Sequence, residues 1–301
     1  MATILRTPDD RFDDLPDFPY PPRYLQVTSP GGEALRMHYV DAGPRHGPVV
    51  LMLHGEPSWS FSWRKVIRVL NEAGYRTLAP DHIGFGRSDK LLERDAYSYR
   101  QYVDWMIDLV QQLDLRRIVL LAQDWGGPIG LSTLAHMPER FAAVVTANTL
   151  LPNCEAPPRG VEDWPGELIE NWVAMSAAAD DLPISDIIAG VSVQELPDRV
   201  KRAYDAPFPS PAFKAAALQF PSLIPLHEGM PGIAENRASW QVLEQWRKPF
   251  ITAFSDSDPT TSAWQQVFQQ RIPGAAGMAH TTIAHAGHFL QEEQGEALGR
   301  V

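Results

Sequence analysis

The sequence predicts an α/β protein with a mostly parallel sheet, and two patterns indicate this fold class. Short apolar runs of strand length alternate with longer stretches in which apolar residues follow the helical period, as in repeated β-α-β units. Between residues 151 and 246 this alternation stops and proline becomes dense, which disfavours further interior strands. We therefore expect an eight-stranded sheet flanked by helices, with a helical cap inserted between two of its strands.

The predicted strands begin with a pair at the sheet edge. These two are separated by the turn sequence Pro30-Gly31-Gly32 and are expected to form an antiparallel hairpin. The later strands alternate with helical stretches and are expected to be parallel. The eight predicted strands cover residues 24–28, 35–41, 49–53, 76–79, 118–122, 143–147, 250–254 and 281–284.

Five helices are expected to cover the sheet, at residues 62–73, 98–113, 127–136, 263–270 and 289–301. In the proline-rich segment, Leu168, Trp172 and Met175 share one face at helical spacing, which indicates short helices separated by turns. The predicted domains are a core of residues 1–150 and 247–301 and a helical cap of residues 151–246.

Composition excludes several classes of protein. The chain has 301 residues with 26 Lys and Arg against 37 Asp and Glu, and its net charge of −11 argues against a nucleic-acid binder or a membrane-surface protein. It is 44% hydrophobic and 21% charged, so it can bury a large core, and no apolar run is long enough for a membrane span or a signal peptide. Cys154 is the only cysteine, which excludes an intrachain disulfide and argues against a cysteine-based metal site. We expect a cytoplasmic protein.

A sharp strand-to-helix turn is predicted at Gln123-Asp124-Trp125-Gly126-Gly127. It follows an apolar strand and opens a helix, which is the setting of a nucleophile elbow, and its glycines permit a tight turn and close helix packing. Such elbows usually read G-x-S-x-G, a motif that this sequence lacks, and aspartate holds the place of serine. An alternative is that Asp124 caps the helix. The surrounding motifs favour Asp124 as a nucleophile.

His54-Gly55-Glu56-Pro57 follows the predicted strand 49–53, at the sheet edge where open α/β proteins bind ligands. A backbone N–H there can face the elbow. The amides of Glu56 and Trp125 are therefore predicted to form an oxyanion hole. The His54 side chain is interpreted as shaping the turn.

A general base is predicted in Ala284-His285-Ala286-Gly287-His288, which follows the last strand. His288 is favoured over His285, because a glycine and the start of a helix bring it to the same rim as Asp124. With His280 these histidines could indicate a metal site, but their spacing crosses from strand to loop and no Cys or acidic residue completes a ligand set. No metal is predicted.

A carboxylate to orient this histidine is offered by Ser255-Asp256-Ser257-Asp258-Pro259, after the predicted strand 250–254. Asp258 is favoured because the proline after it fixes the turn, whereas Asp256 can satisfy loop amides. The other rim position for such an acid holds Asn148, whose amide cannot act as one.

A glycine-rich loop at residues 84–89 raises the question of a dinucleotide cofactor. The third glycine of the usual motif is replaced by Asp89, and no helix begins directly after the strand. No cofactor is predicted.

These motifs resemble those of the haloalkane dehalogenases of the α/β-hydrolase superfamily, in the subgroup whose catalytic acid follows the strand after the cap. The resemblance covers nearly the whole chain and rests on residues 54–59, 123–127, 258–259 and 286–289 and on the cap sequence 203–209. It implies an α/β-hydrolase fold and hydrolysis of haloalkanes to alcohol and halide through an aspartyl alkyl ester, without a cofactor. The final helix is shorter than is common in such folds.

The resemblance also implies two tryptophans that bind the leaving halide, since indole N–H groups donate hydrogen bonds and accept none. One is Trp125, beside the nucleophile. The other belongs to the first cap helix, where Trp172 matches and Trp164 is the alternative. The resemblance further implies an apolar substrate pocket lined by Phe220, Pro221 and Ile224. These three residues could equally belong to the ordinary hydrophobic core of the lid.

Other functions remain open at this point. An epoxide hydrolase would form the same ester on Asp124 but needs a pair of cap tyrosines, and Tyr204 is the only one between residues 151 and 246. A fluoroacetate-type dehalogenase would carry arginine where Trp125 stands. A silent binding protein would not need the complete Asp, His, Asp set. The expected partners of the enzyme are a small apolar halogenated substrate, water and a halide ion, and we expect a monomer.

Overall fold

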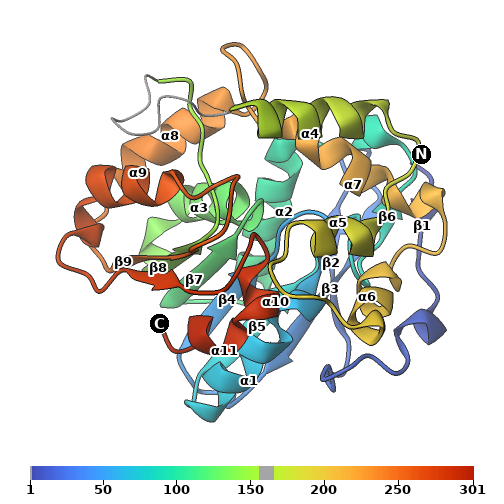
Figure 1. Cartoon of the computed structure of the whole chain (residues 1–301), viewed down its shortest axis with the longest axis horizontal. Helices are drawn as coiled ribbons and strands as arrows, with labels where there is room; N and C mark the ends of the chain where they lie inside the picture. Colours follow the sequence, from blue (N-terminus) through green and yellow to red (C-terminus); the bar gives the residue numbers. More distant parts are fainter. Residues whose placement is uncertain (1, 156–165) are drawn as a thin grey trace.

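A computed structural model describes residues 2–155 and 166–301, and its centre is an eight-stranded sheet in the order β10-β9-β8-β7-β4-β5-β3-β2 (Figure 1). The β2–β3 and β3–β5 pairs are antiparallel, and the others are parallel. The strands are β2 (Arg23–Thr28), β3 (Ala34–Ala42), β4 (Val49–Leu53), β5 (Arg76–Pro80), β7 (Ile118–Gln123), β8 (Phe141–Ala147), β9 (Phe250–Ser255) and β10 (Thr281–Ile283). The predicted fold class is confirmed, and each predicted strand coincides with an observed one apart from small shifts at its ends.

A second, two-stranded sheet pairs β1 (Ile4–Leu5) with β6 (Lys90–Leu91) in antiparallel orientation. The sequence did not predict it, because strands of two residues carry no detectable periodicity.

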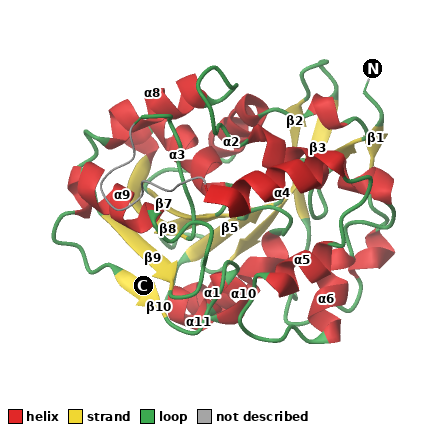
Figure 2. Cartoon of the chain, turned by 45° about the horizontal axis from the view of Figure 1, so that its top comes forward, coloured by secondary structure: helices red, strands yellow, loops and turns green. Residues whose placement is uncertain are grey.

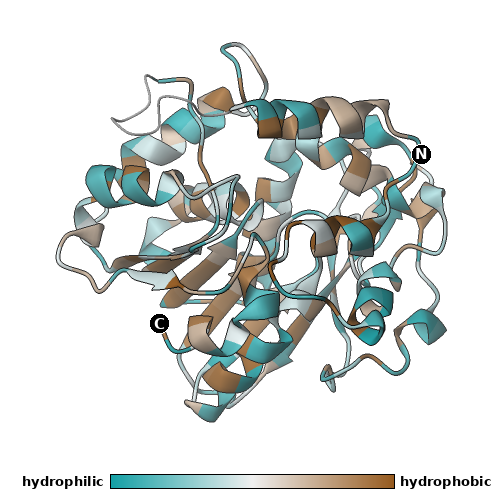
Figure 3. Cartoon of the chain, viewed as in Figure 1, coloured by the Kyte–Doolittle hydropathy of each residue, from teal (hydrophilic) through white to brown (hydrophobic). Residues whose placement is uncertain are grey.

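Helices cover both faces of the large sheet (Figure 1). On one face lie α1 (Arg64–Glu72), α10 (Leu290–Glu293) and α11 (Gly295–Leu298). On the other lie α2 (Tyr99–Gln112), α3 (Gly126–His136), α8 (Ile233–Leu243) and α9 (Trp264–Arg271). The central strands are apolar on both sides because both faces are covered, as the hydropathy colouring shows (Figure 3).

The prediction of one continuous helix over residues 289–301 is wrong, because α10 and α11 are separated at Gln294. Gln294 has φ −126° and ψ 38°, which is not helical. Gly295 then packs so close to α1 that a Cβ on it would lie 2.7 Å from the Cβ of Lys65. Glycine at position 295 permits this close packing of the segment after the break against α1.

The segment predicted as a cap contains the helices α4 (Gly166–Ala178), α5 (Ile184–Gly190), α6 (Asp198–Asp205) and α7 (Ala215–Gln219). In Figure 1 they lie toward the top and the right of the molecule, and in Figure 2 α4 lies in front of the strands. Among the helices that the structure describes, none is long and apolar enough to cross a membrane.

Helix α8 falls within the segment predicted as cap but packs with the core helices. Trp240 of α8 stacks on Phe268 of α9 with ring centroids 5.8 Å apart. Tyr99 of α2 donates a hydrogen bond of 2.7 Å to Asn236 of α8. These contacts group α8 with the layer that covers the sheet.

Candidate active site

Asp124 lies at the turn between β7 and α3, and its backbone has φ +50°, in the left-handed region. Its amide donates to the Asn148 carbonyl (2.9 Å), and its own carbonyl accepts from the Gly127 amide (2.9 Å) and the Thr149 hydroxyl (2.5 Å). A Cβ on Gly127 would collide with the Thr149 side chain. The turn is therefore held from both sides, and only glycine fits at its base.

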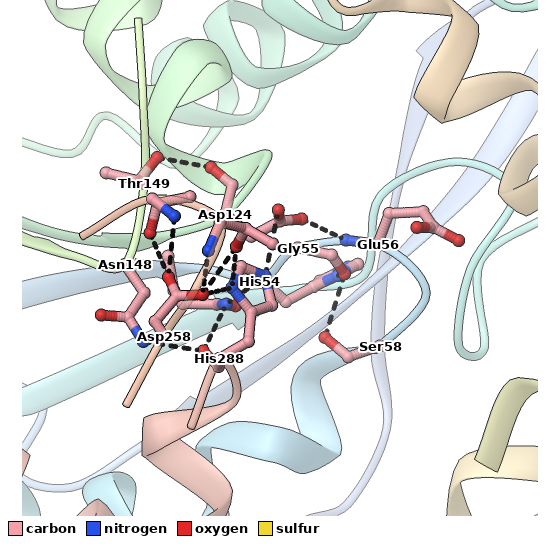
Figure 4. A network of polar contacts seen from close by, with 12 residues as sticks. His54, Gly55, Glu56, Ser58, Asp124, Asn148, Thr149, Asp258 and His288 are labelled. Atoms are coloured by element: carbon pink, nitrogen blue, oxygen red, sulfur yellow. Dashed lines mark hydrogen bonds and ion pairs between the residues drawn. The ribbon is translucent and has the colours of Figure 1, made fainter. Parts of the chain in front are cut away.

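The Asp124 carboxylate points away from the helix and toward two other strand ends (Figure 4). Oδ1 accepts a hydrogen bond of 2.8 Å from the Glu56 amide, in the loop after β4. A Cβ on Gly55 would collide with the Asp124 side chain, so glycine permits this contact. The alternative in which Asp124 caps α3 is wrong, because the helix has no side-chain cap.

His288 and Asp258 complete a line of polar groups behind Asp124 (Figure 4). His288 Nε2 lies 3.3 Å from Asp124 Oδ2, and His288 Nδ1 lies 3.2 Å from Asp258 Oδ1. His288 follows β10 and Asp258 follows β9, so the parallel strands β7, β9 and β10 deliver these three side chains to one edge. The structure thus brings together the residues that the sequence placed on one rim.

The residues that were weighed against this set lie elsewhere. Asp256 is exposed and accepts hydrogen bonds from the amides of His285 (2.9 Å) and Ala286 (3.3 Å). His280 contacts Thr252 through its Nδ1. Within residues 2–155 and 166–301, no group of His, Cys, Asp and Glu is arranged to hold a metal ion.

Two threonines after Asp258 surround its carboxylate, and they were not predicted from the sequence. Thr260 donates to Oδ1 through its hydroxyl (2.6 Å) and its amide (3.0 Å). Thr261 donates to Oδ2 through its hydroxyl and its amide (3.2 Å). The Thr260 hydroxyl also lies 3.1 Å from His288 Nδ1. The Thr-Thr pair directly after Asp-Pro is the signal that could have identified them.

Asn148 and Gln123 hold the loop that carries His288, and their roles were also missed. The Asn148 side-chain amide donates to the carbonyls of Gly287 (2.9 Å) and His288 (3.0 Å), and its oxygen accepts from the Ser255 amide (2.8 Å). The Gln123 amide donates to the His288 carbonyl (3.1 Å). Asn148, at the rim position where an acid could have stood, therefore holds the His288 loop in place through its side-chain amide.

The electrostatics of the site favour a charged histidine between two carboxylates. Burial lowers the pKa of His288, but the charge of Asp258 and the hydrogen bonds to Asp124 and Asp258 outweigh it and raise that pKa to about 10. Burial raises the pKa of Asp258, yet the charge and hydrogen bond of His288 and the threonine hydroxyls hold it well below its usual range.

Glu56 contributes a second, quite different carboxyl group to the site. Burial and the neighbouring charge of Asp124 raise the pKa of Glu56 well above its usual range, which favours the neutral acid. Its Oε1 is buried and has no hydrogen-bond partner within the described residues.

A small apolar cavity of about 150 Å³ opens beside Asp124, and Leu150, Val191 and Phe289 contribute to its walls. Trp125, Trp172 and Ile224, which the resemblance placed at the site, also line it. The remaining lining residues are Glu56, Pro57, Asp124, Leu168, Ile169, Ile187, Thr260, Thr261 and His288.

Two of the expected pocket residues, Phe220 and Pro221, are buried but are not among the residues that line this cavity. Phe220 instead packs edge-on against Trp125, with ring centroids 5.0 Å apart, and Trp125 itself lines the cavity. Trp164, the alternative halide residue, lies outside the described residues.

His54 takes part in a buried network beneath the site. Its Nε2 accepts from the His82 amide (3.0 Å), and its Nδ1 lies 2.9 Å from the Gly55 carbonyl oxygen. Asp81 in turn lies 2.7 Å from His38 and accepts from the Arg87 amide (2.8 Å) in the glycine-rich loop. These groups shape the turns around Asp124, in keeping with the structural role expected of His54.

The fold and the site together define the class of protein: an α/β hydrolase with aspartate at the turn between strand and helix. The sequence profile of the alpha/beta hydrolase fold family matches residues 48–294.

Proteins of similar sequence and structure indicate which family of α/β hydrolases this chain resembles. A haloalkane dehalogenase of Psychrobacter cryohalolentis is 47% identical over 298 residues, covering 99% of this chain and 96% of that protein. One of Mycolicibacterium paratuberculosis is 41% identical, covering 98% of this chain and 95% of that protein. The solved tetrameric haloalkane dehalogenase DpaA from Paraglaciecola agarilytica NO2 has a TM-score of 0.90 and 34% identity, covering 99% of this chain and 97% of its own.

The chain belongs to the haloalkane dehalogenase family. It is a hydrolase that acts on carbon–halide bonds, with a halogenated substrate, water and halide as its reaction partners, and the epoxide hydrolase alternative is not favoured.

Proposed function

We propose that Asp124 attacks the halogen-bearing carbon through Oδ2. The observation that carries this proposal is that the two oxygens of the Asp124 carboxylate have different partners. Oδ1 accepts a hydrogen bond from the Glu56 amide, while Oδ2 faces His288. A carboxylate is anionic at neutral pH and needs no base to attack saturated carbon. The new Oδ2–carbon bond forms as the carbon–halogen bond breaks, and the halide leaves with the bonding electrons.

The departing halide would be bound by the indole N–H groups of Trp125 and Trp172. Both rings line the cavity, from the elbow and from α4 respectively. An unpaired anion in an apolar cavity is costly, so donors aimed at the halide stabilise charge that develops only as the bond breaks. Phe220 would support this arrangement by packing against the Trp125 ring.

The second step is hydrolysis of the ester by water, with His288 as base. Formation of the ester removes the Asp124 charge and hydrogen bond that help to raise the pKa of His288, so the imidazole can release its proton and become basic. Water then attacks the ester carbonyl and gives a proton to Nε2, while Asp258 stabilises the imidazolium. The amides of Glu56 and Trp125 would stabilise the oxyanion on Oδ1. Cleavage of the acyl–oxygen bond, with transfer of that proton to the leaving oxygen, releases the alcohol. The carboxylic acid re-formed on Asp124 then gives its proton to His288, which restores the free enzyme.

The cavity sets the expected size of the substrate. An apolar cavity of about 150 Å³ can hold a molecule the size of benzene, and this one is walled mainly by apolar side chains, aliphatic and aromatic. We propose bromo- and chloroalkanes of roughly three to five carbons as the preferred substrates.

The cap offers no support for epoxide chemistry. Tyr204, its only tyrosine, is fully buried and donates a hydrogen bond of 2.6 Å to Glu292 instead of lining the cavity. A tyrosine in that position cannot protonate an epoxide oxygen held beside Asp124.

The test uses His288→Phe with 1-bromobutane. Displacement does not need the base but ester hydrolysis does, so this variant should release at most one bromide per chain and gain the mass of one butyl group. Asp124→Asn should release no bromide and gain no mass, because an amide is a poor nucleophile. Sustained turnover by His288→Phe, or near-native bromide release by freshly purified Asp124→Asn, would contradict the assignment. Hydrolysis of 1,2-epoxybutane by the wild-type enzyme would instead support the epoxide alternative.

We further propose that one chain is a complete catalytic unit, because all the residues assigned here come from a single chain. A monomer was the expectation from sequence, while a similar solved dehalogenase is tetrameric. Light scattering combined with activity across a dilution series distinguishes a monomer from an assembly whose activity depends on association. A cytoplasmic location stays a proposal based on the single cysteine.

A further inference from the structure

A loop of the cap, residues 191–194 after α5, lies directly on the loop that carries the catalytic histidine. The His288 amide donates to the Val191 carbonyl (2.9 Å), and the Gln194 side chain donates to the His285 carbonyl (3.2 Å). A Cβ on Gly287 would collide with the Val191 carbonyl oxygen, so only glycine permits this approach. The two loops are about a hundred residues apart in sequence, yet they share a hydrogen-bonded boundary.

Glu293 of α10 binds both loops at once. Its Oε1 accepts from the amides of Val193 and Gln194, and its Oε2 accepts from the amide of Gly287, each at 2.7 Å. The residue is only 7% exposed, and no Lys or Arg forms an ion pair with it within the described residues. The buried carboxylate is therefore satisfied by three backbone N–H groups, and such charge-assisted bonds are strong and directional.

The two loops contribute to the same cavity. Val191 forms part of its wall, and His288 is the proposed base on its floor. A displacement of one loop relative to the other would change both the cavity wall and the position of Nε2. Water attack needs that nitrogen within hydrogen-bond reach, and a misplacement of about 1 Å can lower a rate by roughly 10²-fold.

We infer that Glu293 is a positioning residue for ester hydrolysis: its carboxylate joins the cap loop 191–194 to the His288 loop, so that the cavity wall and the base are held as one unit. This inference deepens the proposed function and rests on it. The residue acts through the two loops and does not touch the substrate.

Glu292, the preceding residue, differs from Glu293 and helps to define its role. It is paired with the Arg64 guanidinium through both oxygens and accepts from Tyr204 of α6. Glu292 thus joins the cap to α1 and not to the His288 loop. The two consecutive carboxylates hold different parts of the cap, and only Glu293 connects to the base.

The choice of variants follows from the bonding pattern. In Glu293→Gln the amide oxygen can still accept from Val193 and Gln194, but the NH₂ group then faces the Gly287 N–H, donor against donor. This variant should loosen the histidine side and keep the cap side. Glu293→Ala should loosen both sides. Glu296→Gln is the matched control, because that carboxylate lies on the neighbouring α11, is partly exposed and, among the described residues, forms its ion pair with the exposed Arg68.

The experiment measures the two half-reactions separately with 1-bromobutane and follows amide hydrogen exchange. In Glu293→Gln we expect breakdown of the butyl-enzyme to slow by about tenfold or more, while the bromide burst changes by less than about twofold. Exchange should rise at 285–288 in both Glu293 variants, and at 191–194 only in Glu293→Ala. Glu296→Gln should match the wild-type enzyme in every measurement.

Two results would overturn the inference. One is butyl-enzyme breakdown at the wild-type rate in both Glu293 variants; the other is an equal slowing of burst and breakdown, which indicates a purely structural role. If His288→Phe forms no butyl-enzyme, it is the proposed function that fails. Hydrogen exchange then decides the inference alone: faster exchange in only one of the two loops of Glu293→Ala would contradict a joint role.

Discussion

At the residue scale, the negative charge of the Asp124 carboxylate helps to set the protonation state of His288. With Asp124 ionised, His288 lies between two carboxylates and its pKa is raised to about 10. After the proposed formation of an ester on Asp124, only Asp258 would remain charged. The same imidazole can therefore be a stabilising cation in the free enzyme and a base in the intermediate, and the switch is made by the substrate itself.

This charge arrangement predicts a pH dependence of folding stability. The folded-state pKa of His288 is raised to about 10, against roughly 6.5 in an unfolded chain. Below about pH 6.5 both states carry the proton and the stabilisation is complete. As pH rises toward 10 the folded state binds more protons than the unfolded state, so the contribution is progressively lost.

We expect the free energy of unfolding of the wild-type enzyme to fall more between pH 7 and 9.5 than that of His288→Phe. Urea unfolding at the two pH values measures this difference, and other titrating groups cancel between the two proteins. Equal losses in both proteins would contradict the predicted shift.

The tryptophan assignment predicts a halide-binding defect. Replacing Trp172 by Phe keeps an aromatic ring in the cavity wall but removes the N–H donor. Losing one hydrogen bond to an ion costs about 1.5–3 kcal/mol, or roughly 10- to 150-fold in affinity. Bromide titration followed by tryptophan fluorescence should show this weakening, with a comparable loss in the displacement rate.

Trp164→Phe is the comparison variant for this prediction. If that substitution weakens bromide binding and Trp172→Phe does not, the second halide ligand is Trp164. If neither weakens it, the proposed halide site itself is contradicted.

At the element scale, the elbow depends on how closely α3 approaches its neighbours. Gly126 and Gly127 begin the helix, and a Cβ on either would collide with the Leu53 carbonyl or with the Thr149 side chain. Thr149 in turn donates to the Asp124 carbonyl. The position of Asp124, the proposed nucleophile, therefore depends directly on the packing of α3.

Gly127→Ala should destabilise the fold and the site together. Forcing a methyl group into this contact is expected to cost about 1–3 kcal/mol and to displace Thr149, lowering the rate of the bromide burst. Gly190→Ala is the control, because Gly190 has open space around it and no left-handed backbone. Unfolding midpoints and burst rates should fall only in Gly127→Ala, and an unaffected Gly127→Ala would contradict this account of the elbow.

At the scale of the whole molecule, a buried ion pair connects core and cap. Arg64 of α1 binds Glu292 of α10 through two hydrogen bonds of 2.5 and 2.6 Å, and the two side chains are 2% and 3% exposed. Tyr204 of α6 donates to the same carboxylate. The contact thus joins three segments that are far apart in the sequence.

Arg64→Met should be strongly destabilising because it leaves a buried carboxylate without its main partner. Breaking such a pair costs about 3–5 kcal/mol, and we expect the lower end because Lys65 remains 3.4 Å from Glu292. Arg68→Met removes an exposed ion pair with Glu296 and should cost about 0–1 kcal/mol. Urea unfolding of both variants checks the prediction, and equal losses would contradict it.

Much of the fold was predictable because its signals are local. Apolar strands such as β4 and β7 are followed at once by the residues that form the site, and parallel strands bring their carboxyl ends to one edge. Asp124, Asp258 and His288 could be named for this reason. The family followed from the motifs around them.

The sequence by itself determined the fold class, the position of the elbow and the rim residues, because strand period, glycines and strand ends are encoded within a few neighbouring residues. Only the tertiary structure decided what distant residues do to one another. It broke the last helix at Gln294, grouped α8 with the core and placed Phe220 against Trp125 instead of in the cavity. It also gave Glu293 three amide donors from two loops. Such contacts depend on packing between segments up to a hundred residues apart, so they cannot be predicted from a local sequence pattern.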